Sequence, residues 1–217
     1  MNHIRKILIV RKMLMLLCLI YTLVFVHAQK RQWTPYMLNA YLHENMAVWK
    51  AHVDSLSNSN RLPSTDELIY EYGYCGYIVD KDKEAAKPYV KRFKEHIEAA
   101  HALPYSKDKE TGLPPGHYEM YLSAVYVYEL RLHESFHPVK AMSLAKDAVQ
   151  IAPDDPLTLS YYATCLFYAP KPFGSKAEAL KWFDKADTLF KDPQWEYCWV
   201  REATQMYIQQ CREKLKK

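Results

Sequence analysis

The stretch Val125–Pro153, VYVYELRLHESFHPVKAMSLAKDAVQIAP, decides the fold class. Pro138 stands in its middle, and a proline pushes the residue before it out of helical geometry. One helix must therefore end before His137, and a second begins at Pro138. Beyond this break, small and apolar residues recur every three or four positions, as the buried face of a helix requires: Ala141, Leu144, Ala145, Ala148, Val149 and Ala152. The stretch predicts two helices joined by a short turn, packed antiparallel.

Helix start signals recur on both sides of this hairpin. A cap residue followed by proline, or by glutamate three positions later, occurs at Thr34-Pro35, Ser64–Glu67 (STDE), Asp155-Pro156, Ser175–Glu178 (SKAE) and Asp192-Pro193. These signals predict an all-α fold of about eight helices, near residues 35–57, 64–79, 83–102, 117–133, 138–152, 156–169, 176–190 and 193–215.

Two segments interrupt the pattern. Pro88 falls inside the third helix, which is expected to begin as late as Pro88 or to kink there. The longest irregular stretch, Pro104–Gly116, carries charged residues and a Pro-Pro-Gly sequence. It is either a surface loop of one helical domain, residues 29–217, or a boundary between two halves, residues 29–103 and 117–217.

Small residues on the second helix of each pair repeat their spacing. Ala141, Ala145 and Ala148 are four and three apart, and Ala179, Phe183 and Ala186 follow the same spacing. Helical pairs of this length, with a proline at the turn, resemble tetratricopeptide (TPR) repeats. The resemblance covers Val125–Pro153 best, Pro156–Leu189 next and Asp66–Phe93 least. It implies a superhelix of stacked hairpins that bury one continuous core.

The turn of the second clear repeat, Ala169–Lys176 (APKPFGSK), is longer than the standard repeat allows. A similar proline, Phe-Gly and lysine turn occurs in exported TPR proteins of Bacteroidetes-type bacteria. The resemblance thus implies an exported, non-enzymatic scaffold or binding module. Its expected partner is a protein or peptide, with a glycan as the alternative.

The N-terminal residues read as an export signal. Four basic residues and no acidic ones lie within residues 1–28, followed by an apolar run from Met13 to Val26 and the small residue Ala28. This pattern predicts a signal peptide, residues 1–28, cleaved after Ala28, and a secreted or periplasmic protein. The alternative is a membrane anchor, but a span needs about 20 apolar residues. We expect no stable membrane span after cleavage.

The net charge of +4 belongs to this signal. The chain has 29 Lys plus Arg and 25 Asp plus Glu, and without the four basic residues of the signal the two balance. A balanced chain lacks the basic surface that nucleic acid requires, so no nucleic-acid partner is expected. The chain has only 5 Gly and no Gly-rich phosphate motif, and no cofactor is expected.

Four cysteines follow the signal: Cys75, Cys165, Cys198 and Cys211. An oxidising compartment would permit disulfides between them. Each lies among apolar neighbours, which favours buried free thiols. The spacing matches no zinc site, so no structural metal is expected.

One motif suggests a different function. His133-Glu134-Ser135-Phe136-His137 matches HExxH, in which two histidines on one helix bind zinc and the glutamate is a general base. Pro138 follows directly and should place His137 at the start of the next helix. A small zinc hydrolase using His133, Glu134 and His137 therefore stays only as an alternative to a binding module, and we predict no enzyme.

The chain is rich in aromatic residues, with 18 Tyr and 5 Trp. The simpler interpretation is core packing, with tyrosine rings buried and hydroxyls solvated. The alternative is a binding surface, because in TPR proteins the first helix of each pair lines a concave groove. Carried onto this sequence, that groove would be lined by Tyr70, Tyr74, Tyr77, Tyr126, His133, Thr164, Phe167 and Tyr168. Such an aromatic trough would suit a peptide or a glycan.

Overall fold

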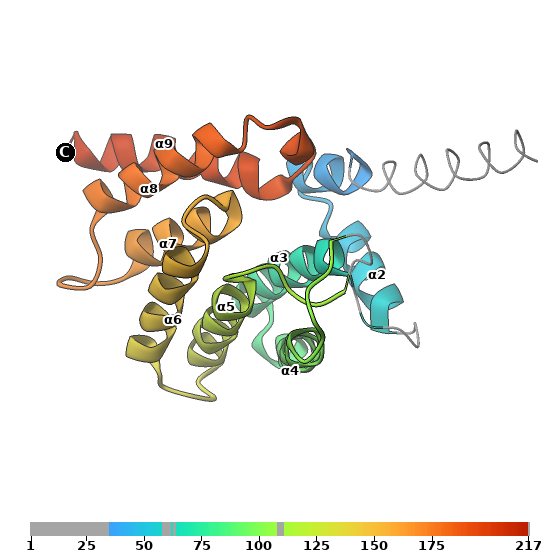
Figure 1. Ribbon diagram of the computed structural model, residues 1–217. Coiled ribbons are helices and arrows are strands. Elements are labelled where there is room, and N and C mark those ends of the chain that lie inside the picture. The colour runs from blue at the N-terminus through green and yellow to red at the C-terminus, as the bar shows by residue number, and fades with distance from the viewer. Residues whose placement is uncertain (1–34, 58–61, 63, 108–110, 217) are drawn as a thin grey trace, which may run out of the picture.

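The computed structural model describes residues 35–57, 62, 64–107 and 111–216, and these residues form an all-α structure (Figure 1). Residues 35–42 are helical. The labelled helices that follow are α2 (Met46–Ser57), α3 (Thr65–Lys81), α4 (Lys83–His101), α5 (His117–Leu132), α6 (Pro138–Ile151), α7 (Pro156–Tyr168), α8 (Lys176–Leu189), the short 3₁₀ helix η1 (Pro193–Trp195) and α9 (Trp199–Leu215). The predicted all-α fold of helical hairpins is confirmed. The predicted signal peptide, residues 1–28, lies outside the described residues.

Two predicted helices are divided in the structure. The predicted helix 35–57 is interrupted at residues 43–45, where Glu44 adopts a left-handed backbone with φ of 53°. The predicted helix 193–215 is split into η1 and α9. Tyr41, just before the first division, and Trp199, just after the second, lie in contact with ring centroids 5.3 Å apart.

The helix boundaries follow the capping residues. Asp82 ends α3 and also caps α4, where its side chain accepts a hydrogen bond from the Ala85 N–H at 3.0 Å. The α3–α4 hairpin therefore turns on a single residue. Helix α4 begins at Lys83, where the predicted range 83–102 begins, and runs through Pro88, so the alternative of a later start at Pro88 is excluded. Asp82 had already fixed the helix start one turn earlier.

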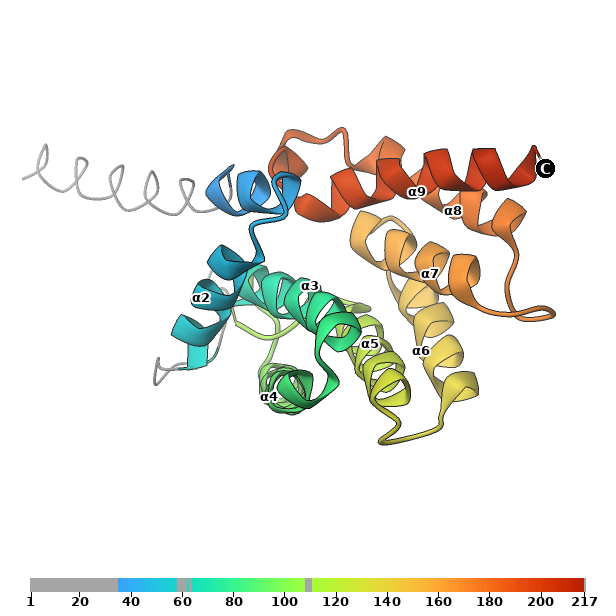
Figure 2. The same ribbon diagram turned by 180° about the vertical axis from the view of Figure 1, so that it is seen from behind.

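The hairpins stack in two layers (Figures 1 and 2). Helices α3, α5, α7 and α9 contact one another in series, and each of α4, α6 and α8 packs against the odd-numbered helices on either side. Helix α7 contacts α5, α6, α8 and α9, and ten of its residues, from Pro156 to Phe167, are buried. A helix enclosed in this way needs apolar residues all round, as its sequence PLTLSYYATCLFY has.

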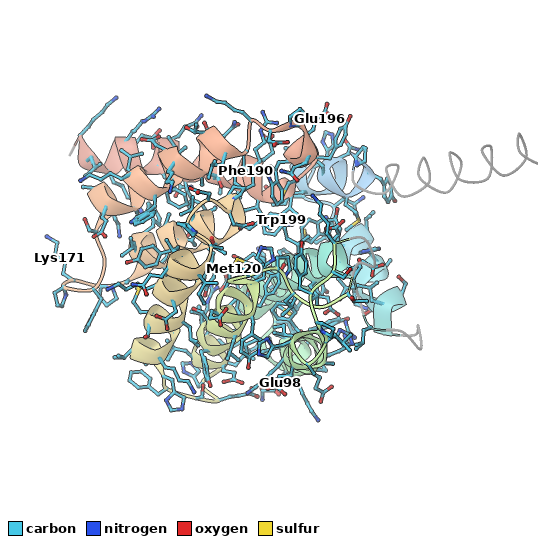
Figure 3. All side chains as sticks on the ribbon, viewed as in Figure 1. Glu98, Met120, Lys171, Phe190, Glu196 and Trp199 are labelled. Atoms are coloured by element: carbon cyan, nitrogen blue, oxygen red, sulfur yellow. The ribbon has the colours of Figure 1, made fainter. Side chains whose placement is uncertain are left out.

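One hydrophobic core extends through the stack. It includes Val90 from α4, Leu113 from the connector before α5, Met120 from α5 and Phe190 after α8. The core is therefore continuous across the connector that could have divided the domain. Side chains such as Met120 and Phe190 lie between helices, while Glu98 and Lys171 point outward (Figure 3).

The first and last parts of the stack meet at Gly73. The indole rings of Trp49 in α2 and Trp199 in α9 pack edge to face with centroids 5.4 Å apart. A Cβ atom on Gly73 would come within 2.8 Å of the Trp199 ring and overlap the Trp49 ring as well. The missing side chain of Gly73 is thus what allows both rings to lie against α3.

Candidate functional site

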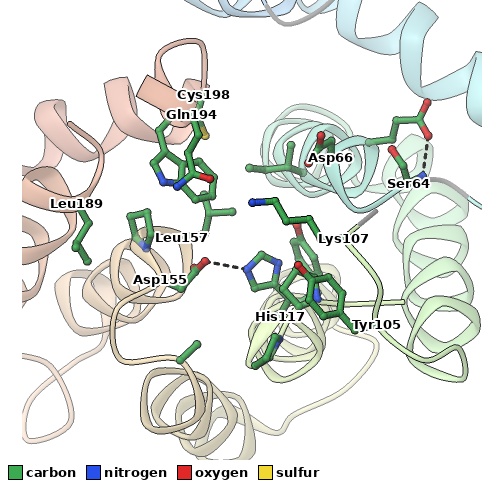
Figure 4. Close-up of a pocket in the computed structure, with 18 of the residues that line it drawn as sticks. Ser64, Asp66, Tyr105, Lys107, His117, Asp155, Leu157, Leu189, Gln194 and Cys198 are labelled. Carbon is green, nitrogen blue, oxygen red and sulfur yellow. Dashed lines mark hydrogen bonds and ion pairs between the residues drawn. The ribbon is translucent and has the colours of Figure 1, made fainter. Parts of the chain in front are cut away.

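A cavity of about 1380 Å³ lies at one end of the stack, where α3, α5, α7 and α9 begin (Figure 4). We call it the terminal cavity. Each connector that leads into one of these helices contributes to its lining, through Ser64, Lys107, Asp155 and Gln194, respectively. The terminal cavity is therefore lined by these connectors and first turns, together with the ends of α2, α6 and α8.

Two residues from the start of α5, His117 and Tyr121, line the terminal cavity. They are one helical turn apart, so their side chains share a face of the helix. Their rings pack edge to face with centroids 5.9 Å apart, and the two residues are only 3% and 0% exposed. Neither His117 Nδ1 nor Tyr121 Oη has a hydrogen-bond partner among the described residues.

Asp155 fixes the orientation of His117. Its side chain caps α7 by accepting a hydrogen bond from the Thr158 N–H at 2.9 Å. Its other oxygen lies 3.3 Å from His117 Nε2 (Figure 4). With Nε2 donating to this carboxylate, a neutral imidazole presents Nδ1 as an acceptor. The Asp155-Pro156 signal correctly predicted the helix start, but not this second contact.

Carboxylates outnumber amines in the lining, but most are already engaged. Glu67 accepts a hydrogen bond from the Ser64 N–H at 2.7 Å, and Asp192 accepts one from the Gln194 N–H at 3.0 Å. Asp154 forms an ion pair at 3.2 Å with Lys185. The Lys107 amine extends toward the middle of the terminal cavity (Figure 4). Several carboxylate oxygens of the lining are thus engaged in helix caps and one ion pair.

Two groups of the lining, the Tyr121 hydroxyl and the Cys198 thiol, stay protonated at neutral pH. Burial raises the pKa of Tyr121 well above its usual value, and the nearby Asp155 and Asp66 carboxylates raise it further. Burial also raises the pKa of the Cys198 thiol to about 12, although the backbone N–H groups after it act in the opposite direction. Tyr121 therefore remains a hydrogen-bond donor as well as an acceptor.

Aromatic rings form much of the remaining wall. Tyr70, Tyr105, Trp195 and Trp199 all line the terminal cavity. Trp195 is held edge to face against the buried Phe190, with centroids 5.8 Å apart. Tyr105 is 46% exposed and belongs to the connector before α5. The wall thus combines rings fixed by the core with one ring on a surface connector.

Of the eight residues predicted to line a concave groove, Tyr70 alone lines the terminal cavity. It is buried, and it contacts Trp49 and His52 edge to face. Tyr74 is also buried and packs against Tyr89 with centroids 4.9 Å apart. Tyr77 lies near the surface with the Lys81 amine over its ring. These three tyrosines therefore occupy three different environments.

The predicted groove residues of the next hairpin lie on its surface. Tyr126 of α5 is partly buried, with the amines of Lys94 and Lys140 over its ring at 5.9 and 4.7 Å. His133, the residue after α5, is exposed, and its Nε2 lies 2.9 Å from the Lys83 amine. These two side chains are thus engaged with lysines.

In α7, Phe167 is buried and Tyr168 is 65% exposed, although their rings are in contact at 5.0 Å. Thr164 is partly buried and donates a hydrogen bond to the Ser160 carbonyl at 2.9 Å. The Tyr168 hydroxyl lies 3.2 Å from that of Tyr207. The structure brings Phe167 and Tyr168 together but does not gather the eight residues into one cavity.

The HExxH match straddles a helix break. Helix α5 ends at Leu132, and His133 caps it with a left-handed φ of 62°. Helix α6 begins at Pro138, with His137 as its N-cap. The two histidines therefore do not share a continuous helix, which the zinc-protease geometry requires. Across the described ranges, no group of three or more His, Cys, Asp or Glu side chains could hold a metal ion.

The four cysteines after residue 34 are free thiols, with Cys75 and Cys211 buried and Cys165 and Cys198 partly buried. Burial raises the pKa of Cys165 to about 12 and holds that of Cys75 well above its usual value. These thiols contribute to packing as small apolar groups.

Sequence reasoning did not identify His117 and Tyr121. One signal was present, since both follow the Pro114-Pro115-Gly116 turn at the spacing of one helical turn. Many helices carry such a pair, however. The pair His117 and Tyr121 is distinguished by two polar atoms that lack hydrogen-bond partners. That property depends on how α3, α7 and α9 pack around the pair, so the sequence does not show it.

No protein-family model matches the chain, and no curated protein matches it. Among solved structures, the HusA haemophore from Porphyromonas gingivalis has a similar fold, with a TM-score of 0.59 and 13% sequence identity. The similarity covers 82% of this chain and 92% of that protein. In the part of the chain that the structure describes, no helix combines the length and apolarity needed to cross a bilayer. The likeness to HusA shows a shared helical fold.

Proposed function

We propose that this chain is an exported, non-enzymatic, TPR-like binding protein that holds a small ligand in the terminal cavity. The observation that carries the proposal is the pair of buried polar atoms without partners, His117 Nδ1 and Tyr121 Oη, in a cavity of about 1380 Å³. Ligand sites are concave, largely apolar and supplied with a few convergent polar groups, and the terminal cavity has this composition.

The energetic reason is direct. A buried polar group without a hydrogen bond costs roughly 1–3 kcal/mol of stability. Two such groups on one helix face therefore destabilise the unliganded protein, and a ligand that bonds to both removes that cost. Binding proteins commonly retain such groups because their function uses them.

The HusA likeness supports a binding role over an enzymatic one, because a haemophore is a haem-binding protein. At 13% identity it supports the fold and does not choose the ligand of this chain. Haem is for that reason a suitable first probe.

The test fills the terminal cavity. Gln194 is exposed, belongs to η1 and extends into the terminal cavity, so Gln194→Trp should occlude it without disturbing the core (Figure 4). Gln209→Trp on the exposed face of α9 is the matched control. Haem binding would be followed by absorbance, and binding from a small-molecule cell extract by native mass spectrometry. We expect at least one compound to bind the wild type and Gln209→Trp but not Gln194→Trp. Binding that is equal in all three proteins would place the ligand elsewhere.

A protein partner is a second candidate, favoured by exposed apolar side chains at the other end of the hairpins. Phe136 and Val139 flank the α5–α6 turn and are 79% and 70% exposed, and Phe173 in the α7–α8 turn is 59% exposed. Such residues are typical anchors of protein contacts. The test is chemical cross-linking to envelope proteins. Cross-links that are lost in Phe136→Ser but kept in Gln194→Trp would support a protein partner over a small ligand.

A further inference from the structure

We infer that the terminal cavity takes an uncharged polyhydroxyl ligand, such as a sugar residue, one hydroxyl of which bridges His117 Nδ1 and Tyr121 Oη. The inference rests on the proposed function and names the chemical class of its ligand.

The bridging group follows from the hydrogen-bonding capacity of the two side chains. With His117 Nε2 donating to Asp155 at 3.3 Å, Nδ1 is an acceptor in the neutral tautomer of the ring, and this is the tautomer that the inferred ligand uses. The Tyr121 hydroxyl can both donate and accept. A ligand hydroxyl can donate to Nδ1 and accept from Tyr121 at the same time. A carboxylate or phosphate oxygen, which only accepts, leaves Nδ1 unsatisfied.

Charge also disfavours an anion. The helix starts that border the terminal cavity could attract one through their free N–H groups. Two of them are already capped by acidic groups, Asp155 on α7 and Glu67 through the α3 capping box. An anionic ligand would therefore meet carboxylates where it needs donors.

A cation is disfavoured for the complementary reason. An ammonium group needs carboxylate oxygens that are free to accept, and oxygens of Glu67, Asp154 and Asp192 already accept from backbone N–H groups or from Lys185. The Lys107 amine, extended into the terminal cavity, adds a positive charge that repels a second one (Figure 4). Neutral hydroxyl groups can use the remaining lone pairs and the Lys107 donors without either repulsion.

The aromatic wall suits the same ligand. Sugar rings present apolar C–H faces between their hydroxyl edges, and such faces pack on flat aromatic rings. Trp195, Trp199 and Tyr105 supply these rings around the polar pair. The site thus combines an apolar surface with a small number of placed polar groups, as ligand recognition requires.

The experiment compares three sugars of nearly equal shape and different charge: D-glucose, D-glucuronate and D-glucosamine. Binding is measured at neutral pH by protein-observed NMR, following the Trp indole N–H signals and the His117 ring. We expect D-glucose to shift signals of the cavity lining, D-glucuronate to bind at least about tenfold more weakly, and D-glucosamine to bind no more tightly than D-glucose.

Variants connect binding to the polar pair. Tyr121→Phe removes one hydroxyl and should weaken D-glucose binding about fivefold to tenfold. Tyr128→Phe is the matched control, because Tyr128 is a buried tyrosine of the same helix that does not line the terminal cavity. It should leave the affinity unchanged, and thermal melts would show that both variants fold.

The inference is overturned if D-glucuronate or D-glucosamine binds most tightly, if D-glucose does not bind, or if Tyr121→Phe leaves sugar binding unchanged. These failures differ from a failure of the proposed function. A non-sugar compound, haem included, that Gln194→Trp excludes would keep the cavity as a binding site and reject the sugar class. If Gln194→Trp changes the binding of no compound, both proposals are wrong.

Discussion

Trp49 and Trp199 meet edge to face, with ring centroids 5.4 Å apart and an interplanar angle of 73°, directly over Gly73. This contact joins α2 to α9. Both rings occupy the space that any larger residue at position 73 would need, so the contact depends on a single glycine.

Gly73→Ala should destabilise the protein. The added Cβ would lie within 3.0 Å of both indole rings, and overpacking of a core typically costs about 1–3 kcal/mol. Urea denaturation followed by tryptophan fluorescence measures the loss. Gly76→Ala, three residues later in α3, is the control, because the added Cβ would lie 3.4 Å from its nearest neighbour, the Tyr128 hydroxyl. That variant should be neutral or more stable by about 0.5–1 kcal/mol, since alanine favours a helix. Equal losses in both would mean that the two rings do not pack against Gly73.

Tyr121→Phe should stabilise the unliganded protein. The Tyr121 hydroxyl is buried without a partner, and removing such a group relieves a cost of roughly 1 kcal/mol or more. Tyr128→Phe should destabilise the protein, because the Tyr128 hydroxyl donates a hydrogen bond to the Tyr72 carbonyl at 2.9 Å. Its loss should cost about 1 kcal/mol. Thermal unfolding of the two variants would give shifts in opposite directions, and a destabilised Tyr121→Phe protein would contradict the unpartnered state of that hydroxyl.

The helix starts could be predicted from sequence because they depend on local chemistry. Pro138 and the Ser175–Glu178 box each mark a start that the structure has. The break at Glu44 could not be predicted, because neither proline nor glycine marks it and the neighbouring Tyr41 contacts Trp199, which is far away along the chain.

For the candidate site, too, the sequence predicts local features but not those that depend on tertiary packing. Assigning Tyr70 or Phe167 to a groove needed a helix register taken from TPR repeats, and the odd-numbered helices here are packed so closely that both residues are buried. The His117 and Tyr121 pair is visible in the sequence as two residues, but their missing partners are a property of the packed structure.

Asp155→Asn should separate the two roles of Asp155. Asparagine caps helices as well as aspartate does, so the free energy of unfolding should change by only a few tenths of a kcal/mol through the cap. The amide, however, no longer fixes His117 through a charged hydrogen bond, and ligand binding should weaken. Asp155→Ala loses both roles and should cost about 1 kcal/mol of stability for the cap alone. Denaturation together with NMR of the His117 ring distinguishes the two variants. An unchanged His117 signal in Asp155→Asn would show that the carboxylate does not orient the ring.

Asp54 should make stability depend on pH. Its carboxylate accepts hydrogen bonds from Lys50 at 2.7 Å and Tyr89 at 2.9 Å, and although burial acts the other way, these bonds lower the pKa of Asp54. A lowered pKa stabilises the folded protein above the unfolded value of about 3.9, and this contribution is lost as the pH falls through the lower folded value.

The wild type should therefore have a higher free energy of unfolding than Asp54→Asn at about pH 5, and this difference should decrease as the pH is lowered to about 3. The change should be below about 1 kcal/mol, because the site is partly solvated. Urea denaturation at both pH values measures it, and Glu213→Gln, at the exposed end of α9, should show no comparable change. A constant difference between wild type and Asp54→Asn would contradict the lowered pKa.

The terminal cavity is bordered by the connectors before α3, α5, α7 and α9, while the turns after α3, α5 and α7 lie at the opposite end of the hairpins. The exposed residues at the mouth of the terminal cavity are thus separated from the turns at the far end of the hairpins. Substitutions at exposed residues of these connectors, such as Tyr105, Lys107 and Gln194, can reshape the mouth while the core residues Leu113 and Phe190 stay in place. The chain is in this respect a scaffold for directed evolution, in which libraries confined to these connectors would change selectivity at little cost in folding.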